Sequence, residues 1–192
     1  MAQASIYQFK ISVKHISPPV WRVVLVPSNI TFTDLHDVII AAFDWYGHHM
    51  FGFYYDLQGT WIGGAGNGDY SDLDDMKDAR KVKLSREFKT ATNMNYMYDF
   101  GDSWECKIEL QKVLSRDSNI SYPVCIKSKG GSMLEDCGGV HGYKVIANWA
   151  RNKTQANTDK LLELGGEDIL EEYANFNPDE FNIKQINFIK QF

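Results

Sequence analysis

The chain has 192 residues and a formal net charge of −5, and 44% of its residues are hydrophobic. At this length roughly 70% of the unfolded surface is buried on folding, so the chain can form a core without disulfide or metal staples. The acidic balance argues against a nucleic-acid-binding protein that relies on a general excess of Lys and Arg, but it leaves a local basic patch open. The longest helix-like apolar run, residues 38–43, is too short to span a membrane, so no membrane partner is expected.

The chain contains three cysteines and shows no secretory leader, which predicts reduced thiols and a cytoplasmic protein. Aromatic residues make up 14% of the chain, a high share that allows two interpretations. They can form a large aromatic core, which is the usual fate of such rings, or they can line a pocket.

Residues 7–13 alternate between polar and apolar side chains, which predicts a half-buried strand. A proline pair ends it, and residues 20–26 resume an extended run that is expected to pair with the first. A helix is predicted to begin at Thr31 or Thr33 and to fade near Gly47, which suits a C-terminal cap. One stripe of this helix carries apolar residues that would pack on the sheet: Leu35, Val38, Ile39, Ala42 and Phe43.

Further strands are predicted at residues 50–57, 95–100 and 104–111, and the last two form a hairpin with a tight turn at Asp99-Phe100-Gly101-Asp102. Residues 63–78 are rich in Gly and Asp, which predicts a loop that is mobile or ordered by a ligand. A second loop is predicted at residues 127–139. Helices are expected at residues 143–151, 158–164 and 167–175, with a last helix that starts around residues 177–180.

Strands that precede helices favour an α+β fold. We expect a mostly antiparallel sheet packed by one N-terminal helix, with C-terminal helices closing one side. The chain is predicted to be a single domain, residues 1–192, with a strand-rich part at 5–126 and a helical part at 142–192. Four residues are predicted to be largely buried: Trp21, Phe43, Trp104 and Ile108.

Three carboxylates, Asp99, Asp102 and Glu105, lie around the predicted turn. They could bind a hard cation or act as acid and base, or the two aspartates could simply bond turn amides. Asp99-Phe100-Gly101 matches the metal-binding tripeptide of kinases as a string, but the other kinase motifs are absent. Residues 63–68 lack the Lys-Ser/Thr of a phosphate loop, so no nucleotide site is predicted.

Three histidines, His36, His48 and His49, could supply imidazoles, although a single helix histidine is more often packed or solvated than a ligand. Cys125 and Cys137 are twelve residues apart, whereas zinc ligands usually come in pairs spaced two to four apart. These cysteines are therefore interpreted as small buried thiols.

We predict that the turn at Asp99–Asp102 and the segment Glu135–Gly139 lie close together and border a shared cleft. Both contain glycine and acids, and buried acids need partners. The alternative is that each loop only caps its own element. The candidate residues of the cleft are Asp99, Asp102, Trp104, Glu105, Glu135, Asp136, Tyr143, His48 and His49. A divalent metal is the one cofactor considered, with Asp102, Asp136 and His48 as its candidate ligands.

Several motifs occur in a fixed order along nearly the whole chain. They are Pro18-Pro19-Val20-Trp21-Arg22, Leu35-His36, Phe43-Asp44-Trp45, His48-His49-Met50-Phe51-Gly52-Phe53, Asp99-Phe100-Gly101-Asp102-Ser103-Trp104-Glu105, Tyr122-Pro123-Val124-Cys125, Glu135-Asp136-Cys137-Gly138-Gly139 with Gly142-Tyr143, and Phe176-Asn177-Pro178-Asp179-Glu180-Phe181. With these motifs the chain resembles the plasmid Ri "ORF three"-like family, which also occurs as a passenger of insertion sequences.

The resemblance implies an α+β fold in one domain and brings no established activity. Some members carry a resolvase-like label, but the sequence shows no serine-recombinase pattern. Cys106 stands where members often have histidine, and Ser132, Met133 and Leu134 stand where many have a cysteine and prolines, which argues against a cysteine-rich metal site. We therefore expect a binding or accessory module for a protein, a small ligand or, less favoured by charge, nucleic acid. The alternative is a metal-assisted hydrolase that uses clustered Asp and His residues.

Overall fold

The computed structural model describes residues 4–65, 76–188 and 192. The elements in chain order are β1 (Ile6–Val13), β2 (Trp21–Pro27), α1 (Phe32–Phe43), β3 (Phe51–Tyr54), β4 (Trp61–Gly64), β5 (Met76–Asp78), α2 (Leu84–Glu87), β6 (Asn93–Tyr98), β7 (Trp104–Leu114), β8 (Val124–Lys129), α3 (Gly139–Arg151), α4 (Gln155–Gly165), α5 (Asp168–Glu172) and the 3-10 turn η1 (Ile183–Gln185).

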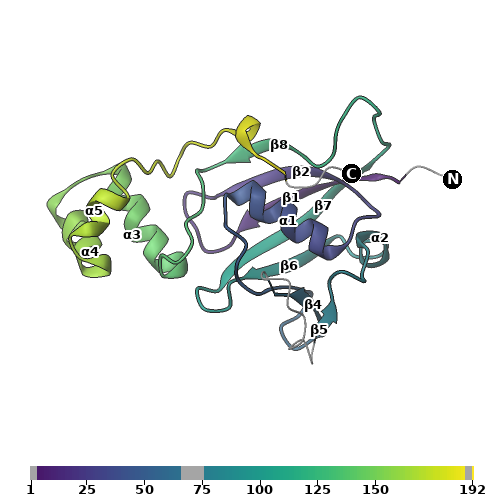
Figure 1. Ribbon diagram of the computed structural model, residues 1–192, viewed down its shortest axis with the longest axis horizontal. Coiled ribbons are helices and arrows are strands. Elements are labelled where there is room, and N and C mark those ends of the chain that lie inside the picture. The colour runs from purple at the N-terminus through teal and green to yellow at the C-terminus, as the bar shows by residue number, and fades with distance from the viewer. Residues whose placement is uncertain (1–3, 66–75, 189–191) are drawn as a thin grey trace.

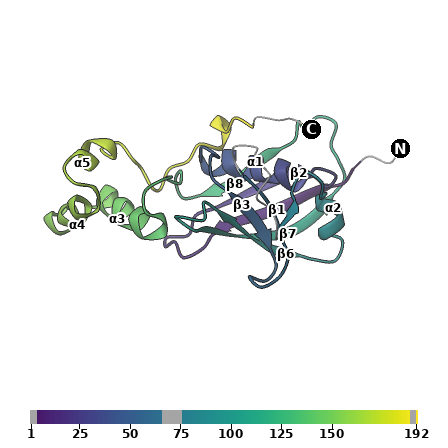
Figure 2. The ribbon, with the colours of Figure 1, turned by 60° about the horizontal axis from the view of Figure 1, so that its bottom comes forward.

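An eight-stranded sheet runs through the described part of the chain in the order β5-β4-β3-β6-β7-β1-β2-β8. The described pairings are antiparallel apart from that of β4 with β5, which confirms the predicted α+β fold with a mostly antiparallel sheet. β1 pairs with β2 as expected, and β6 and β7 form the predicted hairpin, with Tyr98 opposite Trp104. Helix α1 lies against one face of the sheet, and α3, α4 and α5 gather beyond one end of it (Figures 1 and 2).

Helix α1 begins after Thr31, whose side chain accepts from the backbone N–H of Asp34 while the Asp34 carboxylate accepts from Thr31 in return. This capping box satisfies backbone donors that would otherwise lack partners. The helix ends at Asp44, which adopts the left-handed conformation with φ of 65°. Asp44 thus takes the capping position that the sequence had indicated for Gly47, since Asp tolerates this conformation better than most residues.

Two predictions about the second half of the chain were wrong. Residues 127–129 of the expected loop belong to β8, because this strand finds backbone hydrogen-bond partners along the edge of β2. The last predicted helix is absent; Asn177 instead accepts from the N–H of Asp179 through its side chain. The carbonyl of Pro178 accepts from the N–H of Gly131 (2.7 Å), so this segment is tied to the loop after β8. Of the predicted Gly- and Asp-rich loop, residues 66–75 lie outside the described residues.

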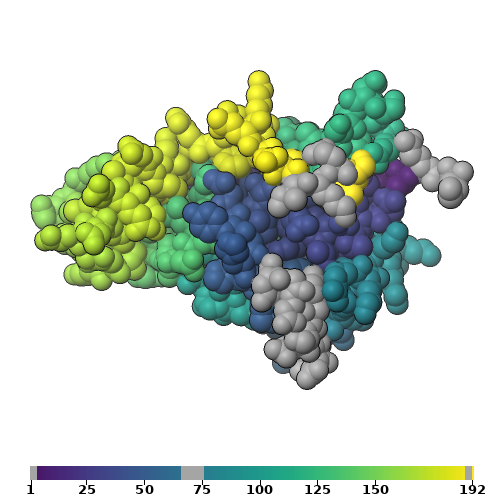
Figure 3. All heavy atoms as spheres, viewed as in Figure 1, coloured from purple at the N-terminus to yellow at the C-terminus, as the bar shows by residue number. Residues whose placement is uncertain are grey.

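A hydrophobic cluster extends from the sheet into the helices at its end. Phe43, Trp104 and Ile108 are fully buried as predicted, whereas Trp21 is only half-buried, with the ammonium group of Lys10 over its ring. Among the described residues, no helix has both the length and the apolar character needed to cross a membrane. The C-terminal segment beyond α5 returns to lie beside α1, as the space-filling view shows (Figure 3).

Candidate functional site

The turn after β6 and the segment before α3 are in direct backbone contact. Gly139 has φ of +64°, and a β-carbon at this position would lie 2.4 Å from the carbonyl oxygen of Asp102. Only a residue without a side chain allows this approach. The structure therefore brings together the two glycine-containing loops that the sequence singled out.

Asp99 organises the turn with one carboxylate oxygen and leaves the other available. It sits in the left-handed region with φ of 54°, and its carbonyl accepts from the N–H of Ser103 (2.6 Å). Its Oδ1 accepts from the backbone N–H groups of Gly101 (2.9 Å) and Asp102 (3.3 Å). The amide-bonding role considered for Asp99 is thus present, but it engages Oδ1 and leaves Oδ2 directed toward His49.

His49, Asp99 and Asp136 form a compact group in which one ligand atom of each residue lies within 4.8 Å of the others. The His49 Nε2 atom is 3.3 Å from Asp136 Oδ1 and 3.7 Å from Asp99 Oδ2. Asp99 is buried, His49 is half-buried and Asp136 is exposed, so the group has a closed side and a side open to solvent. An imidazole and two carboxylates at these separations can hold a divalent cation.

Glu135 lies beside this group but points elsewhere. Its carboxylate accepts from the hydroxyl of Tyr98 and from the backbone N–H of Tyr46. The ring of Tyr98 in turn packs edge-on against the ring of His49, at 5.7 Å between centroids. Burial, followed by the hydrogen bond to Glu135, raises the pKa of Tyr98, so its hydroxyl stays a donor at neutral pH.

Trp104 and Tyr143 lie behind the two turns as part of the core. Both are almost fully buried, and their rings meet edge-on at 6.1 Å between centroids. The ring of Trp45 packs against Trp104 on another side, at 6.0 Å. Among the described side chains, four buried polar atoms have no hydrogen-bond partner: Trp45 Nε1, Trp104 Nε1, Tyr143 Oη and Asp102 Oδ2.

Three other candidates lie outside the His49 group. His48 is exposed and near the ring of Tyr46, and Asp102 contributes its backbone carbonyl to the contact with Gly139. Glu105 alternates with Trp104 along β7 and therefore faces the other side of the sheet. It pairs there with the ammonium group of Lys14 (3.1 Å) and accepts from the hydroxyl of Tyr54 (2.9 Å).

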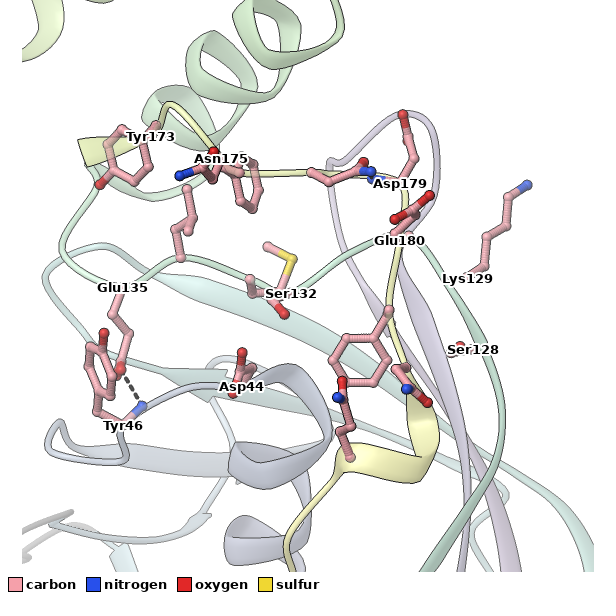
Figure 4. A pocket seen from close by; sticks show the side chains of 18 of the residues that line it. Asp44, Tyr46, Ser128, Lys129, Ser132, Glu135, Tyr173, Asn175, Asp179 and Glu180 are labelled. Carbon is pink, nitrogen blue, oxygen red and sulfur yellow. Dashed lines mark hydrogen bonds between the residues drawn. The ribbon is translucent and has the colours of Figure 1, made fainter. Parts of the chain in front are cut away.

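A large groove, which the sequence did not reveal, lies next to this group. Its walls come from the end of α1, from residues 128–135 after β8 and from residues 172–185 near the C-terminus (Figure 4). The cavity measures about 1060 Å³, and Glu135 lines it directly beside Asp136 of the three-residue group. Because the walls come from three separate stretches, no local pattern predicts the groove, although three of the sequence motifs contribute to its lining through Asp44, Glu135 and residues 176–181.

The family model described as "Plasmid pRiA4b ORF-3-like protein" matches residues 5–185. The chain belongs to this family. A relative, "Uncharacterized protein y4hQ" of Sinorhizobium fredii (strain NBRC 101917 / NGR234), is 30% identical over 177 residues, which cover 91% of this chain and 88% of the relative.

A crystal structure titled as that of a protein of unknown function, MM3350 from Methanosarcina mazei Go1, has a similar fold. It aligns with a TM-score of 0.77 and 32% identity, over 97% of this chain and 100% of that one. Neither description names an activity, so the side chains of this family member are the guide to its function.

The three cysteines of this family member are buried and free, in agreement with their interpretation as packed thiols. Burial raises the pKa of the Cys137 thiol to about 12. At neutral pH Cys137 is therefore protonated, which disfavours it as a metal ligand. Its sulfur instead contacts the carbonyls of Leu134 and Gly139, and so helps hold the segment that carries Asp136.

Proposed function

We propose that this protein is a metal-dependent binding module in which His49, Asp99 and Asp136 hold one divalent cation. The observation that carries the proposal is the convergence of these three ligand atoms from three different segments of the chain. This ligand set differs from the one expected from the sequence. His49 replaces His48, Asp99 replaces Asp102, and Asp136 is kept.

The separations suit a first-row transition metal. Tetrahedral bonds of about 2.0–2.1 Å place neighbouring ligand atoms about 3.3 Å apart. The distances from His49 Nε2 to Asp136 and Asp99, 3.3 and 3.7 Å, are close to this value. An imidazole ligand favours Zn²⁺ over Mg²⁺, Ca²⁺ and Mn²⁺, which suit oxygen ligands.

Three protein ligands leave at least one coordination position for another molecule. The exposed side, where Asp136 lies, is where that position would face. A bound partner could supply a donor atom there, which is how the metal would serve binding. A metal-assisted hydrolase would bind water at the same position. This activity stays a hypothesis that rests on the group of His49, Asp99 and Asp136.

The experiment is a zinc and manganese titration of untagged protein, stripped with a chelator and followed by calorimetry. We expect one ion per chain, and at least about a tenfold loss of affinity for His49→Ala or Asp99→Asn, since each removes one of three ligands. The matched controls are His48→Ala and Asp102→Asn, which remove the same groups from neighbouring positions and should leave the affinity unchanged.

The alternative is that His49, Asp99 and Asp136 contact one another directly and bind no metal ion. In that case the wild type would bind no stoichiometric ion, or the control variants would lose as much affinity as the ligand variants. Circular dichroism of each variant separates a lost metal site from a lost fold.

A further inference from the structure

The groove beside His49, Asp99 and Asp136 consists of two adjoining cavities. A second cavity of about 410 Å³ shares lining residues with the first, among them Asp44, Tyr46, Glu180 and Phe181. The larger cavity alone, at about 1060 Å³, reaches the upper limit of pockets for small ligands, roughly 300–1,000 Å³. An elongated occupant fits this space better than a compact metabolite.

Carboxylates from each wall face this space. Asp44 comes from the end of α1, Glu135 from the segment after β8 and Glu180 from the C-terminal segment (Figure 4). None of these three forms an ion pair with a described side chain. Glu135 accepts from the Tyr98 hydroxyl and the Tyr46 N–H, so it is hydrogen-bonded but has no cationic partner. Two further lining acids are also engaged, since Asp179 pairs with Arg151 and Glu172 accepts from Tyr173.

Two cations lie near these acids without neutralising them. Lys129 lines the groove, while Arg22 is fully buried behind the ring of Phe181, 3.7 Å from the ring centroid. The Arg22 guanidinium donates to the carbonyls of Trp21, Ala42, Lys129, Gly130 and Gly131, at 2.6–3.2 Å. These hydrogen bonds hold Arg22 in place but leave its charge, which acts on Asp44. The groove still has an excess of negative charge, because five carboxylates line it against Lys129 and the nearby guanidinium groups of Arg22 and Arg151.

Aromatic rings and polar donors complete the lining. Tyr46 is 75% exposed at the edge of the groove, and Tyr173 and Phe176 lie across from it. Ring faces attract ammonium and guanidinium groups. Polar side chains that can donate to a carbonyl also line the groove, among them Ser132, Asn182 and Gln185.

The outer wall of the groove is held in place before any ligand arrives. Gly131 donates to Pro178, Arg151 pairs with Asp179, and Arg22 fixes the carbonyls of residues 129–131. A preformed groove loses little conformational entropy on binding.

From these observations we propose that the groove binds a basic, extended peptide segment of a partner protein. Its Lys or Arg side chains meet Asp44, Glu135 and Glu180, and its backbone carbonyls meet donors such as Asn182 and Gln185. This proposal does not require the metal, although Glu135 next to Asp136 would place the bound segment near it.

The test is fluorescence anisotropy with labelled octapeptides that alternate Lys or Arg with Ser, compared with the same peptides in which Gln replaces each basic residue. The titrations are done in a chelator at about 0.15 M salt, so a result here is independent of the metal proposal. We expect the basic peptides to bind at least about tenfold more tightly than the neutral ones.

Two charge variants locate the binding site. Asp44→Asn and Glu180→Gln should each weaken binding of the basic peptide about fivefold, because each removes one exposed carboxylate from the groove lining. The matched control Glu163→Gln removes one exposed carboxylate from α4, outside the groove, and should change the affinity less than about twofold.

Three outcomes overturn the proposal. They are equal binding of basic and neutral peptides, an equal loss for the control and groove variants, and tighter binding of free spermidine than of the peptides. The last would assign the groove to a small polyamine. Unchanged thermal unfolding of each variant shows that the fold is intact.

Discussion

The imidazole of His36 is enclosed in the core rather than placed in a site. It stacks on the ring of Phe51 with 3.7 Å between ring centroids, and its Nδ1 lies 2.8 Å from the hydroxyl of Tyr96. Burial lowers the pKa of His36 from its ordinary 6.5 to about 3. Of the interpretations open for a helix histidine, the packed one is thus correct here.

This burial makes the stability of the protein sensitive to mild acid. Between pH 6.5 and 3 the unfolded chain binds a proton at His36 that the folded chain does not, so stability falls as pH falls. By pH 5 the contribution amounts to about 2 kcal/mol. Urea unfolding at pH 7, 6 and 5 measures the free energy of unfolding at each pH. Between pH 7 and 5 this free energy should fall less for His36→Gln than for the wild type.

The control for this prediction is His141→Gln, which removes an exposed imidazole. Its free energy of unfolding should fall between pH 7 and 5 by as much as that of the wild type. If His36→Gln and His141→Gln gave the same dependence on pH, the acid sensitivity would have to come from other groups.

At the scale of elements, the contact between the β6–β7 turn and the start of α3 holds the metal group together. Gly139 permits this contact, since it is left-handed and touches the carbonyl of Asp102. Gly138 is also left-handed, with φ of +83°, but faces open space. The two neighbours therefore separate the effect of the contact from the effect of backbone strain.

We expect Gly139→Ala to lower the free energy of unfolding by about 3 kcal/mol, because strain and a clash with backbone act together. Gly138→Ala should cost about 1 kcal/mol, from the left-handed conformation alone. Chemical denaturation measures both values. Equal losses would show that the turn and the segment can separate freely.

Much of the element order could be predicted from periodicity. The alternation in β1 and β7 and the stripe on α1 are local signals of burial on one face. β8 could not be predicted in this way because its stability comes from pairing with β2, far away in the sequence. The first residues of α3 could not be predicted as helical, because Gly138, Gly139 and Gly142 are typical of a loop.

The candidate site could be predicted only in part. Glycines and acids indicated that the turn at Asp99 and the segment at Asp136 belong together, and the structure places them in contact. The choice between His48 and His49 depends on backbone direction in an irregular stretch, where no periodicity applies. The groove depends on the path of residues 172–185, which local pattern had assigned in part to a helix.

At the scale of the whole molecule, the strand-rich and helical parts share apolar and polar contacts. Trp104 packs on Tyr143, Gly131 bonds Pro178, and the hydrophobic cluster includes residues of both parts. A shared core is what couples the unfolding of two regions. We therefore expect the chain to behave as a single folding unit.

Native-state hydrogen exchange tests this expectation. The slowest amides of α3, such as Ala147, should show the same free energy of opening as those of β1, such as Phe9, and both should equal the global value. An α3 that opens at a free energy several kcal/mol below that of β1 would instead indicate a helical part that unfolds independently.

The path of the C-terminal segment has a consequence for the order of events on the ribosome. The sheet, α1 and the loop after β8 are complete once residue 135 has emerged, but the outer wall of the groove is supplied by residues 172–185. Until residues 172–185 emerge from the ribosome, Asp44 and Glu135 lie on an open surface that lacks the opposite wall of the groove. A nascent chain can therefore assemble its sheet before the groove, which must wait until residues 172–185 have emerged.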